Sequence, residues 1–346
     1  MEIYDEKTPA HILRGLYATP IICELSKLGI FTKASNKINL RNKAKIKNNF
    51  VLNLCLDYLV HIGVLLKKTK NYELSEMGYE IFRRSNSFFV PHSYREVILN
   101  IGNILTNKKT ISSCKVDRNE NILGSGLTHL RYFFQPINYC NSKIDYNSLI
   151  DLGCGNGHFV NEVLKRKKNI KVVGIDLSPD SVKTCKKNIT KYIGKDKFRV
   201  FKADISKVKL WKNKITKFLQ GTKPLLSLWF MLHEISNHKV KNLKNFLLQV
   251  YQSFPESSII VGEIVRLEDK TLKEIYNKSL MPEYLFFHKI SGQGIMSWNE
   301  YKSLLIDSPY TLEYKWLFDN ANKAKVPSAF VWILKPRKNY VRKKLK

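Results

Sequence analysis

Short hydrophobic runs in the second half of the chain alternate with segments whose apolar residues recur at helical spacing. The runs lie at 149–152, 171–176, 198–203, 224–230 and 258–265. The segments between them repeat apolar residues every three or four positions, which is the spacing of one helix face. Such alternation predicts a doubly wound, mostly parallel α/β sheet with helices on both faces. Two later runs are expected to complete the sheet as an antiparallel pair, at 312–317 and 329–334.

The N-terminal part of the chain has helical spacing followed by two short runs with strand character. It predicts three helices, at 11–20, 20–29 and 50–63, with Pro20 in the first turn of the second. A β-hairpin around a charged turn is expected at 63–74, and a further helix at 75–82. Helices followed by a small β wing resemble a winged-helix domain.

Residues 91–147 are expected to form a linker with helical parts. The stretch 94–99 fits a short helix, whereas 124–134 opens with Gly-Ser-Gly and then becomes amphipathic, so we expect it to start flexible. Arg131 lies in this second stretch. Because a guanidinium pairs well with a carboxylate, Arg131 is a candidate for binding a substrate carboxylate, and a plain surface arginine is the alternative.

A strand, a glycine turn and the start of a helix share the stretch 148–159. Glycine occupies alternate positions of the turn, at Gly153, Gly155 and Gly157. Glycine lets the backbone bend sharply and lets a ligand lie against it without an intervening Cβ. The start of the following helix adds free N–H groups and a partial positive charge. The G-x-G-x-G spacing differs from the G-x-G-x-x-G of dinucleotide sites.

Acidic residues stand at the ends of consecutive strands around this turn. Asp151 lies just before the glycines, Asp176 ends the next strand and Asp204 follows the third. This set resembles the class I S-adenosylmethionine (SAM) methyltransferases. The resemblance implies that the glycine loop passes under the amino acid part of SAM, that Asp176 binds both ribose hydroxyls, and that Asp204 and Ile205 lie at the adenine. A carboxylate accepts two hydroxyl donors well, which is the physical reason for an acid at Asp176.

The same resemblance implies a Rossmann-like sheet that follows, in the sequence, a mainly helical winged-helix domain. In many small-molecule methyltransferases such a domain dimerises and closes the active site, so we expect a homodimer, with DNA binding as the alternative. The expected domains are a winged-helix dimerisation domain, a helical linker and substrate lid, a SAM-dependent methyltransferase domain and a basic tail, at 1–90, 91–147, 148–337 and 338–346.

Composition narrows the choice of partner and location. The formal net charge of +30 would suit nucleic acid, but lysines spread over every surface segment fit a compositional bias as well, so nucleic acid is not the expected partner. No apolar run is long enough to span a membrane, and the acidic N-terminus does not resemble a signal peptide. The six cysteines form no C-x-x-C pair, which argues against a zinc ribbon or a disulfide framework and for a cytoplasmic location.

Two histidines are candidates for the chemistry. His233 follows the fourth strand of the sheet, at the edge where ligands of such sheets bind. His288 follows an aromatic run and precedes the turn Ser291-Gly292-Gln293-Gly294, with a capping box expected at Ser297–Glu300. The alternative for each is a packed core histidine with one hydrogen bond.

The segments "MLHEIS" and "FFHKISGQG" around these histidines are similar to the α-keto acid C-methyltransferases, the group of 2-ketoarginine and phenylpyruvate C-methyltransferases. The resemblance implies that His233 and His288 hold a metal ion, iron or zinc, and that the keto and carboxylate oxygens of a 2-oxo acid complete its coordination. Glu234 would orient the site or take protons, and Gln293 is counted with the substrate contacts. The expected reaction is methyl transfer to C3 of the 2-oxo acid through a metal-stabilised enolate, in biosynthesis of a 3-methylated amino acid.

Two other functions remain open at this point. One is a metal-free O-methyltransferase of a small phenol, with His233 as general base and His288 structural. The other is an RNA or protein methyltransferase that uses the basic surface, although residues 230–233 lack the Asn/Asp-Pro-Pro-aromatic motif of many enzymes that methylate amino nitrogens. Imidazole suits zinc and iron alike, so two histidines do not name the metal. The side chain of the oxo acid also stays open between a guanidino group and an aromatic ring.

Overall fold

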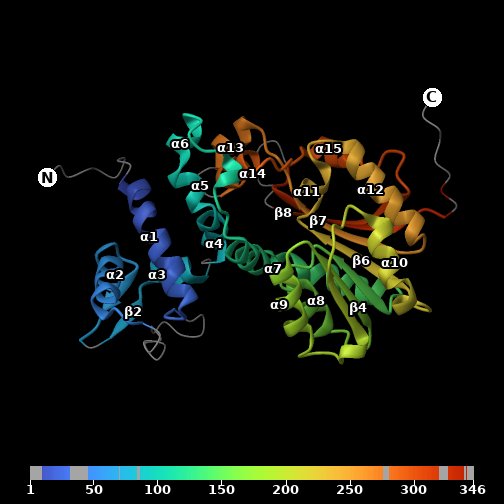
Figure 1. Ribbon diagram of the computed structural model, residues 1–346, viewed down its shortest axis with the longest axis horizontal. Helices are drawn as coiled ribbons and strands as arrows, with labels where there is room; N and C mark the ends of the chain where they lie inside the picture. The colour runs from blue at the N-terminus through green and yellow to red at the C-terminus, as the bar shows by residue number, and fades with distance from the viewer. Residues whose placement is uncertain are drawn as a thin grey trace. The chain divides into compact units, whose positions relative to one another are not determined.

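The computed structural model describes residues 10–31, 46–69, 71–83, 86–275, 280–318, 326–338 and 340. Most of the expected basic tail lies outside the described residues. The chain divides into two compact units (Figure 1). Unit 1 comprises Met1–Lys109 and Cys114–Thr128, and unit 2 comprises Thr110–Ser113 and His129–Lys346.

Unit 1 opens with the elements that the sequence pattern predicts for its first part. They are α1 Ala10–Lys27, α2 Asn49–His61, β1 Leu65–Lys67, β2 Tyr72–Leu74 and α3 Glu76–Arg83. The two strands pair antiparallel, with Leu65 opposite Leu74. Leu56, Leu59 and Phe82 belong to one buried apolar cluster that joins the helices to this hairpin. The predicted helix at 50–63, the hairpin and the helix that follows it are therefore confirmed.

One prediction in this region is wrong, because α1 is a single helix rather than two helices separated at Pro20. Proline lacks the N–H that would bond to the carbonyl four residues earlier. That residue is Leu16, which is exposed, so water can satisfy the carbonyl. Burial of Ile22, Cys23 and Leu25 then holds the second half of the helix in place. Packing of one apolar face has outweighed the local signal of the proline.

The connection to the sheet is helical. It consists of α4 Asn86–Ser93, α5 Arg95–Leu99, α6 Ile101–Leu105, the short 3-10 turn η2 Ile111–Ser113 and α7 Arg118–Lys143. The expected helix at 94–99 is confirmed. The flexible start expected at 124–126 is wrong, because these residues lie inside the long helix α7. The first part of α7 belongs to unit 1 and the rest, from His129, to unit 2.

Unit 2 is built on a seven-stranded sheet in the order β5-β4-β3-β6-β7-β9-β8 (Figure 1). The strands are β3 Ser148–Leu152, β4 Lys171–Asp176, β5 Phe198–Lys202, β6 Pro224–Trp229, β7 Ile259–Ile264, β8 Tyr310–Phe318 and β9 Ala329–Pro336. The first five pair parallel. β9 pairs antiparallel with both β7 and β8. The predicted Rossmann-like sheet and its antiparallel pair are confirmed.

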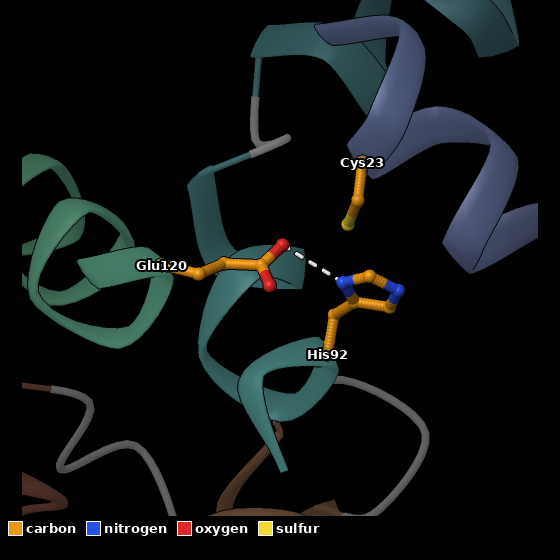
Figure 2. A group of neighbouring side chains, drawn as sticks. All are labelled: Cys23, His92 and Glu120. Atoms are coloured by element: carbon orange, nitrogen blue, oxygen red, sulfur yellow. Dashed lines mark hydrogen bonds and ion pairs between the residues drawn. The ribbon is translucent and has the colours of Figure 1, made fainter. Parts of the chain in front are cut away.

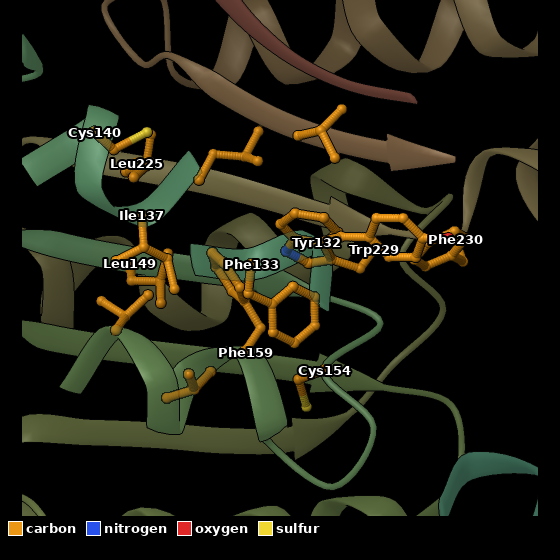
Figure 3. Packing of buried hydrophobic residues seen from close by; sticks show 14 of the residues in the cluster. Tyr132, Phe133, Ile137, Cys140, Leu149, Cys154, Phe159, Leu225, Trp229 and Phe230 are labelled. Atoms are coloured by element: carbon orange, nitrogen blue, oxygen red, sulfur yellow. The ribbon is translucent and has the colours of Figure 1, made fainter. Parts of the chain in front are cut away.

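Helices cover both faces of this sheet. They are α8 His158–Leu164, α9 Pro179–Ile189, α10 Val208–Leu219, α11 Leu232–Ser236, α12 Val240–Ser253, α13 Asp269–Ile275, α14 Met281–Ile290 and α15 Trp298–Ser303, with the 3-10 turn η3 Lys195–Lys197. Strand side chains alternate between faces, so Leu149 joins one core cluster and Ile150 the other. Figure 3 shows the first of these clusters.

Local signals set the starts of two helices in unit 2. Ser178 caps α9 by accepting a hydrogen bond from the N–H of Ser181, with a proline in the first turn. At α15 the expected capping box is present between Ser297 and Glu300. Among the helices described, none combines the length and the apolar character that crossing a membrane requires.

Candidate active site

The glycine turn after β3 has a conformation and a packing that favour glycine. Gly153 and Gly157 have φ angles of 80° and 79°, in the left-handed region. A Cβ at Gly153 would lie 2.5 Å from Cγ of Met231, and one at Gly157 would lie 2.9 Å from Sγ of Cys185. The turn is therefore pressed against the loop after β6 and against α9, and larger side chains would push it out of place.

Asp176, at the end of β4, fastens the turn from the neighbouring strand. Its Oδ2 accepts the N–H of Gly155 at 2.9 Å, and its Oδ1 accepts the N–H of Ser178 at 2.8 Å. Burial raises the pKa of Asp176, and hydrogen bonds from backbone N–H groups oppose this. A carboxylate has about four acceptor positions, so two remain for further donors.

Asp151 lies inside the sheet rather than on the turn. Its carboxyl group is buried and accepts a 2.6 Å hydrogen bond from Oγ of Ser227 on the neighbouring strand β6. Burial, with a smaller contribution from the charge of Asp176, raises the pKa of Asp151 to about 7. An uncharged carboxyl group at this position can donate a hydrogen bond as well as accept one.

Asp204 and Ile205 follow β5 at the same edge of the sheet. Asp204 is exposed and accepts hydrogen bonds from the backbone N–H and the hydroxyl of Ser206, at 2.9 and 2.7 Å. Ile205 is buried, and its carbonyl accepts the indole N–H of Trp211 at 2.9 Å. The adenine contacts expected of both residues stay predictions.

The two candidate histidines lie side by side. His233 is on α11 and His288 is on α14, and their ring centroids are 4.9 Å apart at an angle of 83°. Both side chains are buried. The fold therefore brings together two residues that the sequence separates by a strand, a long helix and a further helix.

A hydrogen bond at Nδ1 orients each ring. Nδ1 of His233 lies 3.0 Å from Oε1 of Glu263 on β7, and Nδ1 of His288 lies 2.5 Å from the carbonyl of Tyr284. Both partners are acceptors, so each Nδ1 carries the hydrogen and each Nε2 keeps a lone pair. This is the arrangement in which histidine binds a metal ion or takes up a proton.

The two rings differ in their affinity for protons. Burial, with a smaller contribution from the nearby His233, lowers the pKa of His288 to about 4. Burial also acts to lower the pKa of His233, but the charge of Glu263 and the hydrogen bond to it together raise that pKa. His233 is therefore the ring suited to accept a proton, and His288 stays neutral at pH 7.

The turn after α14 is bound to α11 by several polar contacts. Nε2 of Gln293 donates to Oε1 of Glu234 at 2.9 Å, and Oγ of Ser236 donates to the carbonyl of Gly294 at 3.1 Å. A Cβ at Gly294 would lie 2.6 Å from the backbone nitrogen of His238. The two motifs singled out in the sequence thus hold each other, and two predicted site residues, Glu234 and Gln293, are partners.

Glu263 is a site residue that the sequence analysis missed. It is fully buried on β7, where Oε1 also accepts the N–H of Ile264 at 2.8 Å, while Oε2 accepts the backbone N–H of His233 at 3.2 Å. A lone acid inside the apolar strand 259–264 was the available signal. A buried charge needs a partner, so an acid in this strand indicates that a hydrogen-bond donor lies near the end of the strand.

Aromatic side chains lie beside His288, and Arg131 is near one of them, Tyr284. Tyr284 stacks on His288 with ring centroids 6.1 Å apart, and Phe287 lies 5.3 Å from the same ring. The guanidinium of Arg131 lies over the ring of Tyr132, 4.6 Å from its centroid, and donates to the hydroxyl of Tyr132. Burial raises the pKa of Tyr284, Tyr132 adds to this and Arg131 opposes it, so these three side chains share one environment.

Two family models match parts of the chain. Residues 145–308 match the family described as a methyltransferase domain, and residues 14–108 match the AprA winged helix domain. No sequence among the curated proteins matches the chain.

Solved structures with the same fold cover nearly the whole chain. An O-methyltransferase family protein from Burkholderia thailandensis is 11% identical, covers 96% of this chain and 99% of its own, and has a TM-score of 0.61. Human N-acetylserotonin methyltransferase in complex with SAM is 12% identical, covers 97% and 100%, and has a TM-score of 0.59. Mitomycin 7-O-methyltransferase MmcR is 13% identical, covers 96% and 98%, and has a TM-score of 0.58. At these identities the likeness is one of fold.

The glycine turn and the carboxylates at the strand ends occur within the residues that match the methyltransferase family. The chain is therefore a SAM-dependent methyltransferase, in which an N-terminal winged-helix domain precedes a class I methyltransferase domain in the sequence.

Proposed function

We propose that this enzyme transfers the methyl group of SAM to C3 of a 2-oxo acid, with a metal ion held by His233 and His288. The observation that carries the proposal is the pairing of two buried rings, 4.9 Å apart, whose Nδ1 atoms are both engaged. Nε2 lone pairs on adjacent rings are the donor set that zinc and iron accept. A carboxylate or carbonyl on the opposite nitrogen is the usual support of a metal-binding histidine.

A bound ion would withdraw electrons from the keto and carboxylate oxygens of the substrate and so make its C3 proton easier to remove. In this proposal His233 and His288 hold the ion and Glu263 keeps His233 in the correct tautomer. Glu263 is not the base, because its two oxygens already accept three hydrogen bonds. Glu234 is exposed and close enough for its charge to act on His233, so it or a water molecule takes the C3 proton.

The surroundings of His288 favour an apolar or aromatic side chain on the oxo acid. Tyr284 and Phe287 flank the ring, and Arg131 adds a positive charge nearby. A guanidino group would be repelled by Arg131, whereas the carboxylate of an oxo acid would pair with it. In this proposal Arg131 binds the substrate carboxylate and Gln293 positions Glu234.

A second candidate is O-methylation of a small phenol without a metal. The raised pKa of His233 beside Glu263 suits a general base. Proteins of the same fold include an O-methyltransferase family protein and mitomycin 7-O-methyltransferase. A panel of 2-oxo acids and phenols, incubated with SAM and with or without iron or zinc, separates the two. Turnover of oxo acids that depends on metal supports the first, and metal-independent turnover of phenols supports the second.

The homodimer and the cytoplasmic location are part of this proposal. Unit 1 exposes large apolar side chains on α2, of which Phe50 is 72% and Leu54 is 53% accessible. These residues are four apart on one helix face, where a second subunit could cover them. Within the described residues no disulfide joins any of the six cysteines, which fits a reducing compartment.

A further inference from the structure

A second group of side chains of metal-binding types lies in unit 1, whereas His233 and His288 belong to unit 2. Cys23 on α1, His92 on α4 and Glu120 on α7 point toward one another (Figure 2). All three are buried, with exposed fractions of 1%, 5% and 3%. Within the described ranges, they form a group of three whose ligand atoms all lie within 4.8 Å of one another.

The three helices position these atoms from different parts of the chain. Oε1 of Glu120 lies 2.8 Å from Nδ1 of His92, and the thiol of Cys23 points toward this pair (Figure 2). A tetrahedral ion separates its nitrogen and oxygen ligands by roughly 3.3 Å, given bonds of about 2.0 Å to each. A small movement of the His92 and Glu120 side chains is therefore enough to admit an ion.

Two cationic side chains, Arg95 and Lys27, contact the ligand atoms and would have to move when an ion binds. Arg95 donates to Oε2 of Glu120 at 2.7 Å and lies 3.5 Å from Nδ1 of His92. Nζ of Lys27 is 3.5 Å from Oε1 of Glu120, but it is 2.5 Å from its own partner Glu24 on the same helix. Both cationic side chains reach solvent, so they can move away from an arriving ion.

The charges around the cluster favour a divalent cation. The ion-pair network has one more carboxylate than cations, and consists of Glu24, Asp117 and Glu120 with Lys27 and Arg95. A divalent ion together with a Cys23 thiolate would bring this network to neutrality. Thiolate and imidazole ligands select zinc and similar transition metals over magnesium or calcium, which prefer oxygen ligands.

We propose that Cys23, His92 and Glu120 form a binding site for a zinc-class transition metal in the winged-helix unit. The ion would tie α1 and α4 to the first part of α7. Three protein ligands leave the fourth tetrahedral position to water. Metal bound to the folded protein alone would stabilise unit 1 by mass action.

Cobalt(II) titration of the full-length protein tests this proposal, because thiolate-to-cobalt charge transfer absorbs in the near ultraviolet. Cobalt bound by the two imidazoles of His233 and His288 gives no such band, so the band distinguishes the two proposed metal sites. We expect metal-stripped protein to develop the band as cobalt is added, and zinc to abolish it. Cys23→Ser should lose the band, whereas Cys55→Ser in the same unit and His288→Ala should keep it.

Glu120→Gln provides a second variant that keeps the size of the side chain. It should weaken cobalt binding at least about tenfold, because a ligand has lost its charge. Circular dichroism of each variant without metal checks folding. In the His288→Ala background, zinc should raise the melting temperature when Cys23 is present but not when Cys23→Ser is added. Absence of the band in the wild type, or its persistence in Cys23→Ser, would overturn the proposal.

Discussion

Glu263 holds His233 at two points, since one carboxylate oxygen lies 3.0 Å from the imidazole Nδ1 and the other accepts the backbone N–H at 3.2 Å. The contact joins the end of β7 to α11, next to the end of β6. It fixes the tautomer of the histidine, the orientation of its ring and its affinity for a proton at the same time.

Replacing this carboxylate should therefore change the titration of His233. In Glu263→Gln the negative charge is lost, so the pKa of His233 should fall toward and below its ordinary value. The raised pKa stabilises the folded protein below the pKa of unfolded histidine, and this contribution is lost as the pH rises through the folded value. The variant should therefore lose stability relative to wild type at acid pH more than at pH 8.

NMR titration of the metal-free protein measures the pKa of His233. Urea unfolding at acid pH and at pH 8 measures the stability of wild type and variant. Metal affinity of Glu263→Gln should fall about 10–100-fold if the ring holds an ion. Glu268→Gln, in the loop that follows β7, is the matched control. An unchanged His233 titration would show that Glu263 does not act on the ring.

SAM binding should depend on Asp176. Asp176→Ala removes the hydrogen bonds to Gly155 and Ser178, together with those proposed to the ribose. Each hydrogen bond to a charged group contributes about 1.5–3 kcal/mol, so affinity should fall at least about tenfold. Isothermal titration calorimetry gives the affinity, with Asp180→Ala on α9 as the control. Equal affinities for wild type and Asp176→Ala would contradict the cofactor site.

The contact between the two histidine segments should fail when Gly294 gains a methyl group. In Gly294→Ala the new Cβ would lie 2.6 Å from the backbone of His238, so the turn 291–295 must move. Overpacking of this kind costs about 1–3 kcal/mol, and activity should fall while SAM affinity remains. Gly102→Ala, where nothing lies within 4 Å of the added Cβ, is the control and should be neutral in both assays.

Dimerisation should depend on the exposed face of α2. Phe50→Glu combined with Leu54→Glu places two charges where the proposal expects an apolar interface, so the variant should be monomeric in light scattering. Leu177→Glu changes an exposed leucine of unit 2 and should leave the dimer intact. A wild type that is monomeric at micromolar concentration would exclude the dimer altogether.

The sequence predicts the sheet well because its information is local. Successive strand residues such as Leu149 and Ile150 point to opposite faces of the sheet. The glycines of the turn indicate its left-handed backbone conformation directly. Pro20 and the glycines at 124 and 126 misled the prediction, since tertiary packing carries α1 and α7 through residues that weaken isolated helices.

The partners of the site residues are harder to predict, because they come from distant segments. The motif around His233 indicated a ligand but not that Glu263 would orient it. The group of Cys23, His92 and Glu120 has no spacing that a short motif would reveal, and it appears only when three helices pack. In both cases the missing information is which elements become neighbours.

The most direct test of the central claim is the activity of His288→Ala beside chelator-treated wild type, with the metal content of both recorded. Under the two-histidine proposal both samples lose the ion from this site and nearly all activity on 2-oxo acids. Both should still bind SAM, because the proposed cofactor site is at the ends of β3 and β4. Added iron or zinc should restore only the chelated wild type. Full activity in both samples would contradict the metal-dependent reaction and leave His233 as the general base of an O-methyltransferase.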